Sequence, residues 1–115
     1  MTTQIDTALL SRQIQTRLML HELGFPVHLI GYKQLCIAIP QYSMDDNQSL
    51  TKDLYPYMAK CFRYYSWRAV ERAIRNVIQV AWKNRNPTVW EDFFPGLRKA
   101  PSNKQFIATI AERLK

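Results

Sequence analysis

Residues 67–78 read Trp67-Arg68-Ala69-Val70-Glu71-Arg72-Ala73-Ile74-Arg75-Asn76-Val77-Ile78, and this stretch decides the fold. Apolar residues recur through it and just beyond it at the spacing of an amphipathic helix: Val70, Ala73, Ile74, Val77, Ile78, Ala81 and Trp82. The opposite face carries Arg68, Glu71, Arg72, Arg75 and Gln79. Arginine matches the O6/N7 edge of guanine, and glutamate accepts a hydrogen bond from N4 of cytosine. This face therefore predicts a helix that reads double-stranded DNA.

Positive charge is concentrated around this helix. The chain has 16 Lys and Arg residues against 9 Asp and Glu residues, a net charge of +7. From Lys60 to Arg85, seven basic residues accompany one acid, Glu71, so this segment carries +6. A local basic stripe is typical of a protein that binds a polyanion. On charge alone, a solvated helix face that is basic by chance is an equally good explanation.

Length and composition predict one all-helical domain. The 115 residues are 47% hydrophobic and 12% aromatic, which excludes a disordered tail and allows a buried core. Only three glycines and few alternating runs argue against strands. No apolar run approaches the roughly 18 residues that span a membrane, and the N-terminus has no signal-peptide pattern. We therefore expect a cytoplasmic protein without a membrane partner.

The apolar periodicity predicts about six helices. The first starts near Ile5 and ends before Gly24 and Pro26, and the second covers residues 28–39, ended by Pro40. Residues 41–49 read as a loop or weak turn. Residues 51–63 are helical in pattern, with a break near Tyr55 because Pro56 favours a first turn.

Capping residues mark the later helices. Ser66 is a suitable N-cap for a helix that runs to about Lys83. Two capping boxes follow, Thr88-Val89-Trp90-Glu91 before a short helix and Ser102-Asn103-Lys104-Gln105 before the last one. In the last helix we expect Phe106, Ile107 and Ile110 to fill the core rather than a dimer contact.

These patterns predict a helix-turn-helix over residues 56–83. In this motif the second helix, here residues 66–83, enters the major groove and reads bases with its N-terminal half. Arg68, Glu71, Arg72 and Arg75 fall in that half, whereas Lys60 and Arg63 flank the DNA backbone.

Several motifs stand in a family-specific order along nearly the whole chain. They are His21-Glu22-Leu23-Gly24, Leu54-Tyr55-Pro56-Tyr57-Met58-Ala59-Lys60, Val70-Glu71-Arg72-Ala73-Ile74-Arg75, Val80-Ala81-Trp82 and Pro101-Ser102-Asn103 with Phe106-Ile107-Ala108. In these the chain resembles the C-terminal effector domain of stage zero sporulation protein A, a response regulator of endospore formation in Firmicutes. The resemblance implies a six-helix bundle of the winged-helix-like effector superfamily, without a β wing. It also implies transcriptional regulation through boxes of the TTCGACA type.

The resemblance implies roles for particular residues. Glu71, Arg72 and Arg75 match the family's DNA-contacting positions, and Asn76 replaces a histidine and can read adenine or bond a phosphate. The turn, Tyr64-Tyr65-Ser66-Trp67, is one residue longer and bulkier than in the family. Arg68 lies one residue before the family's arginine, which rotates it by about 100° and favours a phosphate contact. The expected backbone contacts are Lys60, Arg63, Gln79, Lys83, Arg98 and Lys99.

The resemblance also implies partners. The family's regulator carries a receiver domain, for which this chain has no room. We expect either a stand-alone effector that binds related boxes without phosphorylation, which we favour, or an excised domain. Double-stranded DNA is the main partner, with a homodimer on tandem boxes and RNA polymerase as further partners.

No residue pattern predicts catalysis. His21 and His28 lack ligand-spaced companions and read as structural, so we expect no enzyme activity, no metal and no cofactor. Cys36 and Cys61 read as buried free thiols. Trp82, Trp90, Phe93 and Phe94 read as core.

The alternative function is a protein-interaction module with weak or altered DNA binding. Tyr64, Tyr65 and Trp67, if exposed, would resemble a protein-binding hot spot for a regulator or RNA polymerase. DNA binding would weaken steeply with salt, whereas an aromatic interface would change little.

Overall fold

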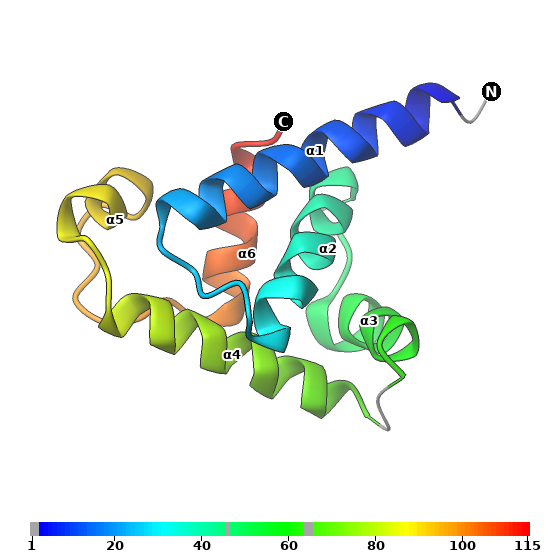
Figure 1. Cartoon of the computed structure of the whole chain (residues 1–115). Helices are drawn as coiled ribbons and strands as arrows, with labels where there is room; N and C mark the ends of the chain where they lie inside the picture. Colours follow the sequence, from blue (N-terminus) through cyan, green and yellow to red (C-terminus); the bar gives the residue numbers. More distant parts are fainter. Residues whose placement is uncertain (1–2, 46, 64–65) are drawn as a thin grey trace.

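The computed structural model describes residues 3–45, 47–63 and 66–115, with side chains from Thr7 onward. The described residues form helices, and no strand occurs among them. In chain order the helices are α1 (Thr3–Glu22), α2 (Ile30–Met44), η1 (Leu50–Leu54), α3 (Tyr55–Cys61), α4 (Trp67–Lys83), α5 (Pro87–Phe93) and α6 (Asn103–Glu112) (Figure 1). The all-helical prediction is confirmed. The predicted break near Tyr55 is also confirmed, because a π-helical turn, η1, meets α3 there.

The end of α1 follows the sequence prediction. Gly24 has a φ of +78°, in the left-handed region that glycine adopts without steric cost. The N–H of Phe25 donates to the carbonyl of Leu20 at 3.0 Å, and the N–H of Gly24 donates to the carbonyl of His21 at 3.0 Å. This pair of bonds is a Schellman motif, which satisfies the last carbonyls of the helix.

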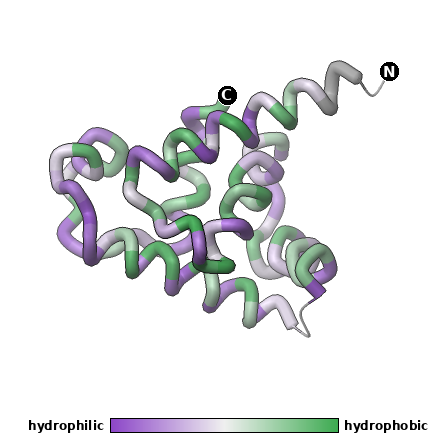
Figure 2. Tube along the Cα trace, in the orientation of Figure 1, coloured by the Kyte–Doolittle hydropathy of each residue, from purple (hydrophilic) through white to green (hydrophobic). Residues whose placement is uncertain are grey.

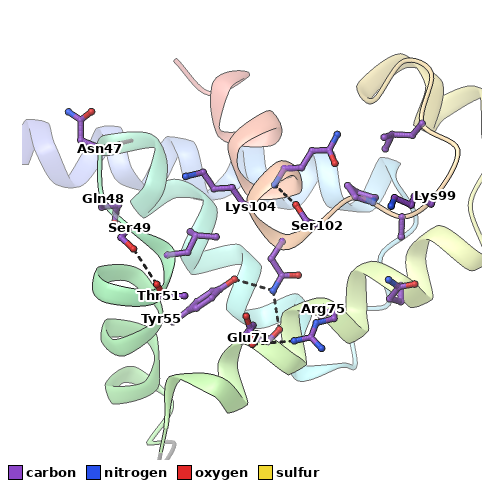
Figure 3. A pocket seen from close by; sticks show the side chains of 17 residues that line it. Asn47, Gln48, Ser49, Thr51, Tyr55, Glu71, Arg75, Lys99, Ser102 and Lys104 are labelled. Carbon is purple, nitrogen blue, oxygen red and sulfur yellow. Dashed lines mark hydrogen bonds and ion pairs between the residues drawn. The ribbon is translucent and has the colours of Figure 1, made fainter.

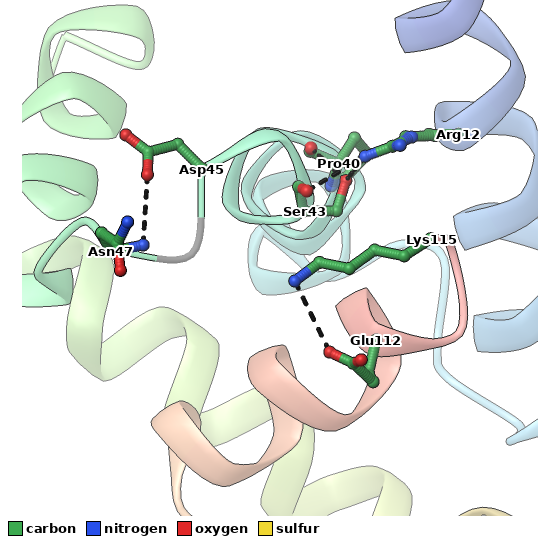
Figure 4. A network of polar contacts seen from close by, with 7 residues as sticks. All are labelled: Arg12, Pro40, Ser43, Asp45, Asn47, Glu112 and Lys115. Atoms are coloured by element: carbon green, nitrogen blue, oxygen red, sulfur yellow. Dashed lines mark hydrogen bonds and ion pairs between the residues drawn. The ribbon is translucent and has the colours of Figure 1, made fainter.

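The end of α2 does not follow the prediction. Pro40 lies inside the helix, which continues to Met44, so the predicted stop at Pro40 and the predicted loop over residues 41–44 are wrong. Pro40 is buried, and its carbonyl accepts a hydrogen bond from Ser43 Oγ at 2.6 Å. Arg12 of α1 donates to the carbonyl and hydroxyl of Ser43 at 3.0 and 2.9 Å (Figure 4). Tertiary contacts therefore hold a helical turn that proline alone disfavours.

Helix α2 occupies the centre of the bundle and packs against α1, α4 and α6 (Figure 1). It crosses α4 closely at Gly31, where a Cβ atom would collide with the carbonyl oxygen of Ala73 and lie 2.8 Å from Val77 Cγ1. Apolar and polar residues alternate along α4 at helical spacing (Figure 2). The close crossing places one face of α4 in the core and leaves the other to solvent.

An aromatic cluster lies around α5. Trp90 of α5 lies between Phe94, at a ring-centroid distance of 5.5 Å, and Trp82 of α4, also at 5.5 Å. Its indole N–H donates to the carbonyl of Leu23 at 3.1 Å. Trp90, Phe93 and Phe94 are buried and Trp82 is partly buried, which confirms their prediction as core residues.

The two predicted capping boxes differ in outcome. The first is wrong: Asn86, not Thr88, is the N-cap of α5, because its side chain accepts from the N–H of Thr88 at 3.0 Å. The Glu91 carboxylate accepts instead from the N–H of Gly96 at 2.9 Å. The second is confirmed at its cap, because Ser102 Oγ accepts from the N–H of Gln105 at 3.1 Å. Phe106, Ile107 and Ile110 of α6 are 0% exposed, as predicted for core residues.

Candidate nucleic-acid interface

Helices α3 and α4 lie at the positions of the predicted helix-turn-helix and pack against each other. Helix α3 ends at Cys61, and Arg63, two residues later, has a φ of +58°, in the left-handed region. Ser66 occupies the N-cap position of α4 with extended backbone, but its side chain makes no capping hydrogen bond. Tyr64 and Tyr65 lie outside the described residues.

Helix α4 has one buried and one exposed face. Val70, Ile74 and Val77 are 0% exposed, and Ile78 and Ala81 are 1% exposed. The exposed residues are Arg68, Arg72, Arg75, Asn76, Gln79 and Lys83. The structure thus brings the predicted base-contacting residues onto one surface, with Glu71 partly exposed at its edge.

Glu71 and Arg75 form an ion pair on this surface. Arg75 Nη2 lies 3.2 Å from Glu71 Oε1, and the two side chains are 54% and 33% exposed respectively. Exposed pairs of this kind contribute about 0.2–1 kcal/mol, so a DNA base can displace one partner at small cost. Within the described part of the chain no ion pair joins Arg72 to an acid, so its guanidinium is less committed to hydrogen bonding than that of Arg75.

The start of α4 is held by an aromatic stack. The rings of Tyr55 and Trp67 lie 6.2 Å apart at an interplanar angle of 11°. The Arg68 guanidinium lies 4.8 Å from the centre of a Trp67 ring. Trp67 is half-buried, so it is a structural residue of the motif as well as a surface aromatic.

Further cations flank α4. Lys60 and Arg63 are exposed at the end of α3, and Arg98 and Lys99 are exposed between α5 and α6. A groove of about 1090 Å³ runs between α4, the start of η1 and the start of α6 (Figure 3). Arg75 and Gln79 line one side of this groove, and Lys99 and Lys104 line another.

Sequence reasoning did not single out Lys104 or Asn103 as site residues. Lys104 is exposed in the first turn of α6, and Asn103 hydrogen-bonds α4 from there. Both residues directly follow Ser102. The Ser102 cap predicts that a helix begins there, but it does not predict that this helix begins beside α4. Only the tertiary packing shows that α6 begins next to α4.

The two cysteines lie in different environments, whereas the two histidines do not. Cys36 is buried, but Cys61 is exposed, so its prediction as a buried thiol is wrong. His21 and His28 are exposed rather than enclosed by the core. The described residues contain no group of three or more His, Cys, Asp or Glu side chains that could hold a metal ion. Across the same residues, no helix is long and apolar enough to cross a membrane.

One family model matches the chain. The family described as sporulation initiation factor Spo0A C terminal matches residues 16–114, which include all of α2 to α6 and part of α1. The chain therefore belongs to this family of sporulation-associated DNA-binding effector domains. The resemblance inferred from the ordered motifs is confirmed.

Proposed function

We propose that this protein is a sequence-specific DNA-binding transcriptional regulator whose helix α4 reads the major groove. The observation that carries the proposal is the exposed face of α4, where arginine, asparagine and glutamine side chains lie together while the opposite face is buried. In a helix-turn-helix the second helix presents such a face to base edges. The family membership supports the same function.

In this proposal Arg72 and Arg75 contact bases, with Glu71 and Asn76 beside them. Arg68 lies at the start of α4 over Trp67 and contacts a base edge or an adjacent phosphate. The backbone is held by Lys60, Arg63, Gln79, Lys83, Arg98 and Lys99. The protein acts in the cytoplasm, and its target is a DNA box related to TTCGACA. A homodimer binds tandem boxes, and RNA polymerase is a further partner. No chemical reaction forms part of this function.

Fluorescence anisotropy tests the proposal directly. One labelled duplex carries two TTCGACA-type boxes, and a second duplex carries the scrambled sequence. Wild-type protein should prefer the first duplex, and Arg72→Ala should lose about 10- to 100-fold of affinity for it, because one bidentate arginine contact contributes about 1–3 kcal/mol. Arg17→Ala is the matched control, since it removes an exposed arginine from α1, which lies across the molecule from α4 (Figure 1). Equal binding of wild-type protein to both duplexes would contradict this box.

A second candidate is a protein-interaction module, favoured by an exposed apolar stripe on α1. Leu10, Ile14 and Leu18 are 56%, 52% and 60% exposed and lie at intervals of four residues along one helix face. If this reading is correct, the protein should bind neither duplex, and its complex with a regulator or RNA polymerase should weaken in Ile14→Ser but not in Arg72→Ala. That complex should also depend little on salt.

A further inference from the structure

Asn103 lies where α3, α4 and α6 meet. Its side-chain Nδ2 donates to the carbonyl oxygen of Glu71 at 3.0 Å and to the hydroxyl oxygen of Tyr55 at 3.0 Å (Figure 3). A backbone carbonyl only accepts hydrogen bonds, so the NH₂ group of Asn103, and not its oxygen, must face Glu71. One amide therefore connects the first residue of α6 with both helices of the helix-turn-helix.

Tyr55 extends this connection to the start of α4. The side chain is 2% exposed, and burial raises the pKa of its hydroxyl above the ordinary value, so the group is a neutral hydrogen-bonding partner at physiological pH. Its ring stacks on Trp67, the first residue of α4. Helix α4 is thus held at Trp67 by the stack and at Glu71 by Asn103, one turn further along.

We propose that Asn103, acting with Tyr55, is a positioning residue that sets the rotation of α4 and thereby its discrimination between base sequences. This inference rests on the proposed function. The apolar contacts under α4 hold it against the bundle, and the Asn103 bond adds a directional restraint on its rotation. The Asn103 bond acts at Glu71, whose side chain pairs with Arg75 on the exposed face.

The size of the effect follows from helix geometry. Side chains reach about 5–6 Å from a helix axis, so a rotation of 20° moves their ends by about 2 Å. Hydrogen bonds to base edges tolerate only about 0.5 Å of variation in length. Phosphate contacts through long, flexible lysines tolerate more. Loss of the Asn103 bond should therefore reduce discrimination between sequences more than total DNA affinity.

The test compares Asn103→Ala, Tyr55→Phe and the double variant with wild-type protein. Gln105→Ala is the matched control, because Gln105 is exposed in the same turn of α6 and lines the same groove. Two quantities are measured at low temperature, after circular dichroism has checked that each variant is folded. One is the ratio of affinities for the box duplex and the scrambled duplex. The other is the set of backbone amide chemical shifts without DNA.

We expect Asn103→Ala to lower the affinity ratio about 10-fold while binding to scrambled DNA changes less than about twofold. Tyr55→Phe retains the ring stack and should have a smaller effect. The double variant should match Asn103→Ala, because Tyr55 acts on Glu71 through Asn103. The amides of α4 should shift in Asn103→Ala and stay unchanged in Gln105→Ala.

The two measurements separate failure of this inference from failure of the proposed function. If wild-type protein does not discriminate between the duplexes, the proposed function fails, and the α4 amide shifts still decide whether Asn103 positions the helix. If wild-type protein discriminates and Asn103→Ala retains the full ratio, the positioning role is overturned. Unchanged α4 amides in Asn103→Ala would also overturn it. A loss of thermal stability with an unchanged ratio would leave Asn103 a structural residue only.

Discussion

At the scale of single residues, the turn of the helix-turn-helix contains an unusual backbone conformation. Arg63 has a φ of +58°, a left-handed conformation that costs an L-amino acid with a Cβ atom about 1–2 kcal/mol. Glycine is the usual residue at such a position after a helix. The arginine is exposed and belongs to the proposed backbone contacts. Backbone strain of this kind is frequent at functional sites.

Replacing Arg63 by glycine should therefore stabilise the fold and weaken DNA binding. We expect a gain of about 0.5–1 kcal/mol, less than the full relief because glycine gains entropy in the unfolded chain. This corresponds to a rise in Tm of about 2–4 °C, measured by circular dichroism. Arg63→Ala is the control, because it removes the charge but keeps the strain. Equal Tm values for the two variants would show that the strain relieved at this position does not exceed the entropy that glycine gains in the unfolded chain.

The buried thiol of Cys36 should make stability depend on alkaline pH. Burial raises the pKa of Cys36 above its ordinary value, so the folded state keeps a proton that the unfolded state releases. The stabilisation is complete below the ordinary thiol pKa, near 9, and is lost as the pH rises toward the folded-state pKa.

Urea unfolding between pH 7 and pH 10, in the presence of a reductant, measures this dependence. Wild-type stability should fall above about pH 9, by at most about 1.4 kcal/mol per pH unit for this group. Cys36→Ala should be less stable at pH 7 but lose less on going to pH 10. Parallel pH curves for the two proteins would exclude Cys36 as the source. A residual slope is expected from Tyr55, whose pKa burial also raises.

At the scale of helices, the crossing of α2 and α4 depends on Gly31. A methyl group there would overlap the carbonyl of Ala73, and backbone atoms of a packed helix cannot move aside cheaply. Gly31→Ala should lower the free energy of unfolding by about 1–3 kcal/mol, measured in urea. The two helices must separate, so the exposed face of α4 should also move.

Gly96→Ala is the appropriate comparison for this substitution. Its φ of +79° is unfavourable for alanine, but no heavy atom lies within 4 Å of the added Cβ. It should cost about 1 kcal/mol and leave the amide shifts of α4 unchanged. If Gly31→Ala is as mild as Gly96→Ala in both measurements, the close crossing of α2 and α4 does not constrain the fold.

The elements also show how far the sequence predicts the fold. Local signals predicted the end of α1 at Gly24 and the cap of α6 at Ser102, because both depend on hydrogen bonds within a few residues. The predicted helix end at Pro40 is wrong because burial and the Arg12–Ser43 contact, 31 residues apart, extend α2 past it. The predicted cap at Thr88 is wrong because Asn86, two residues earlier, is an equally good cap.

The candidate site also contains residues that the sequence predicts and one that it does not. The exposed face of α4 was predictable, because Arg68, Arg72 and Arg75 share a face on any helix of normal pitch. Asn103 was not predictable as a site residue, since its partners Tyr55 and Glu71 lie 48 and 32 residues away in sequence. Helical periodicity determines what a helix exposes, but only packing determines which side chains reach it from other helices.

At the scale of the whole molecule, positive charge is distributed unevenly. The segment from Lys60 to Arg85 carries +6 of the net +7, and α4 lies across the bundle from α1 (Figure 1). Lys99 and Lys104 extend the basic surface beyond that segment, because the fold brings the start of α6 to the groove beside α4. Arg75 of α4 and these two lysines therefore line one groove, although they come from two parts of the sequence.

DNA binding should consequently weaken steeply with salt. If about five phosphates are contacted, the logarithm of the binding constant should fall against the logarithm of salt with a slope of about −4.5. A fourfold rise in salt would then reduce the affinity for either duplex by about 500-fold, measured by anisotropy. The double variant Lys99→Ala, Lys104→Ala should make the slope shallower by about 2 and weaken specific and scrambled binding alike. Arg17→Ala on α1 should leave the slope unchanged. If the lysine variant keeps the wild-type slope, the DNA backbone does not pass along the groove between α4 and α6, and the phosphate contacts must lie toward Lys60 and Arg63.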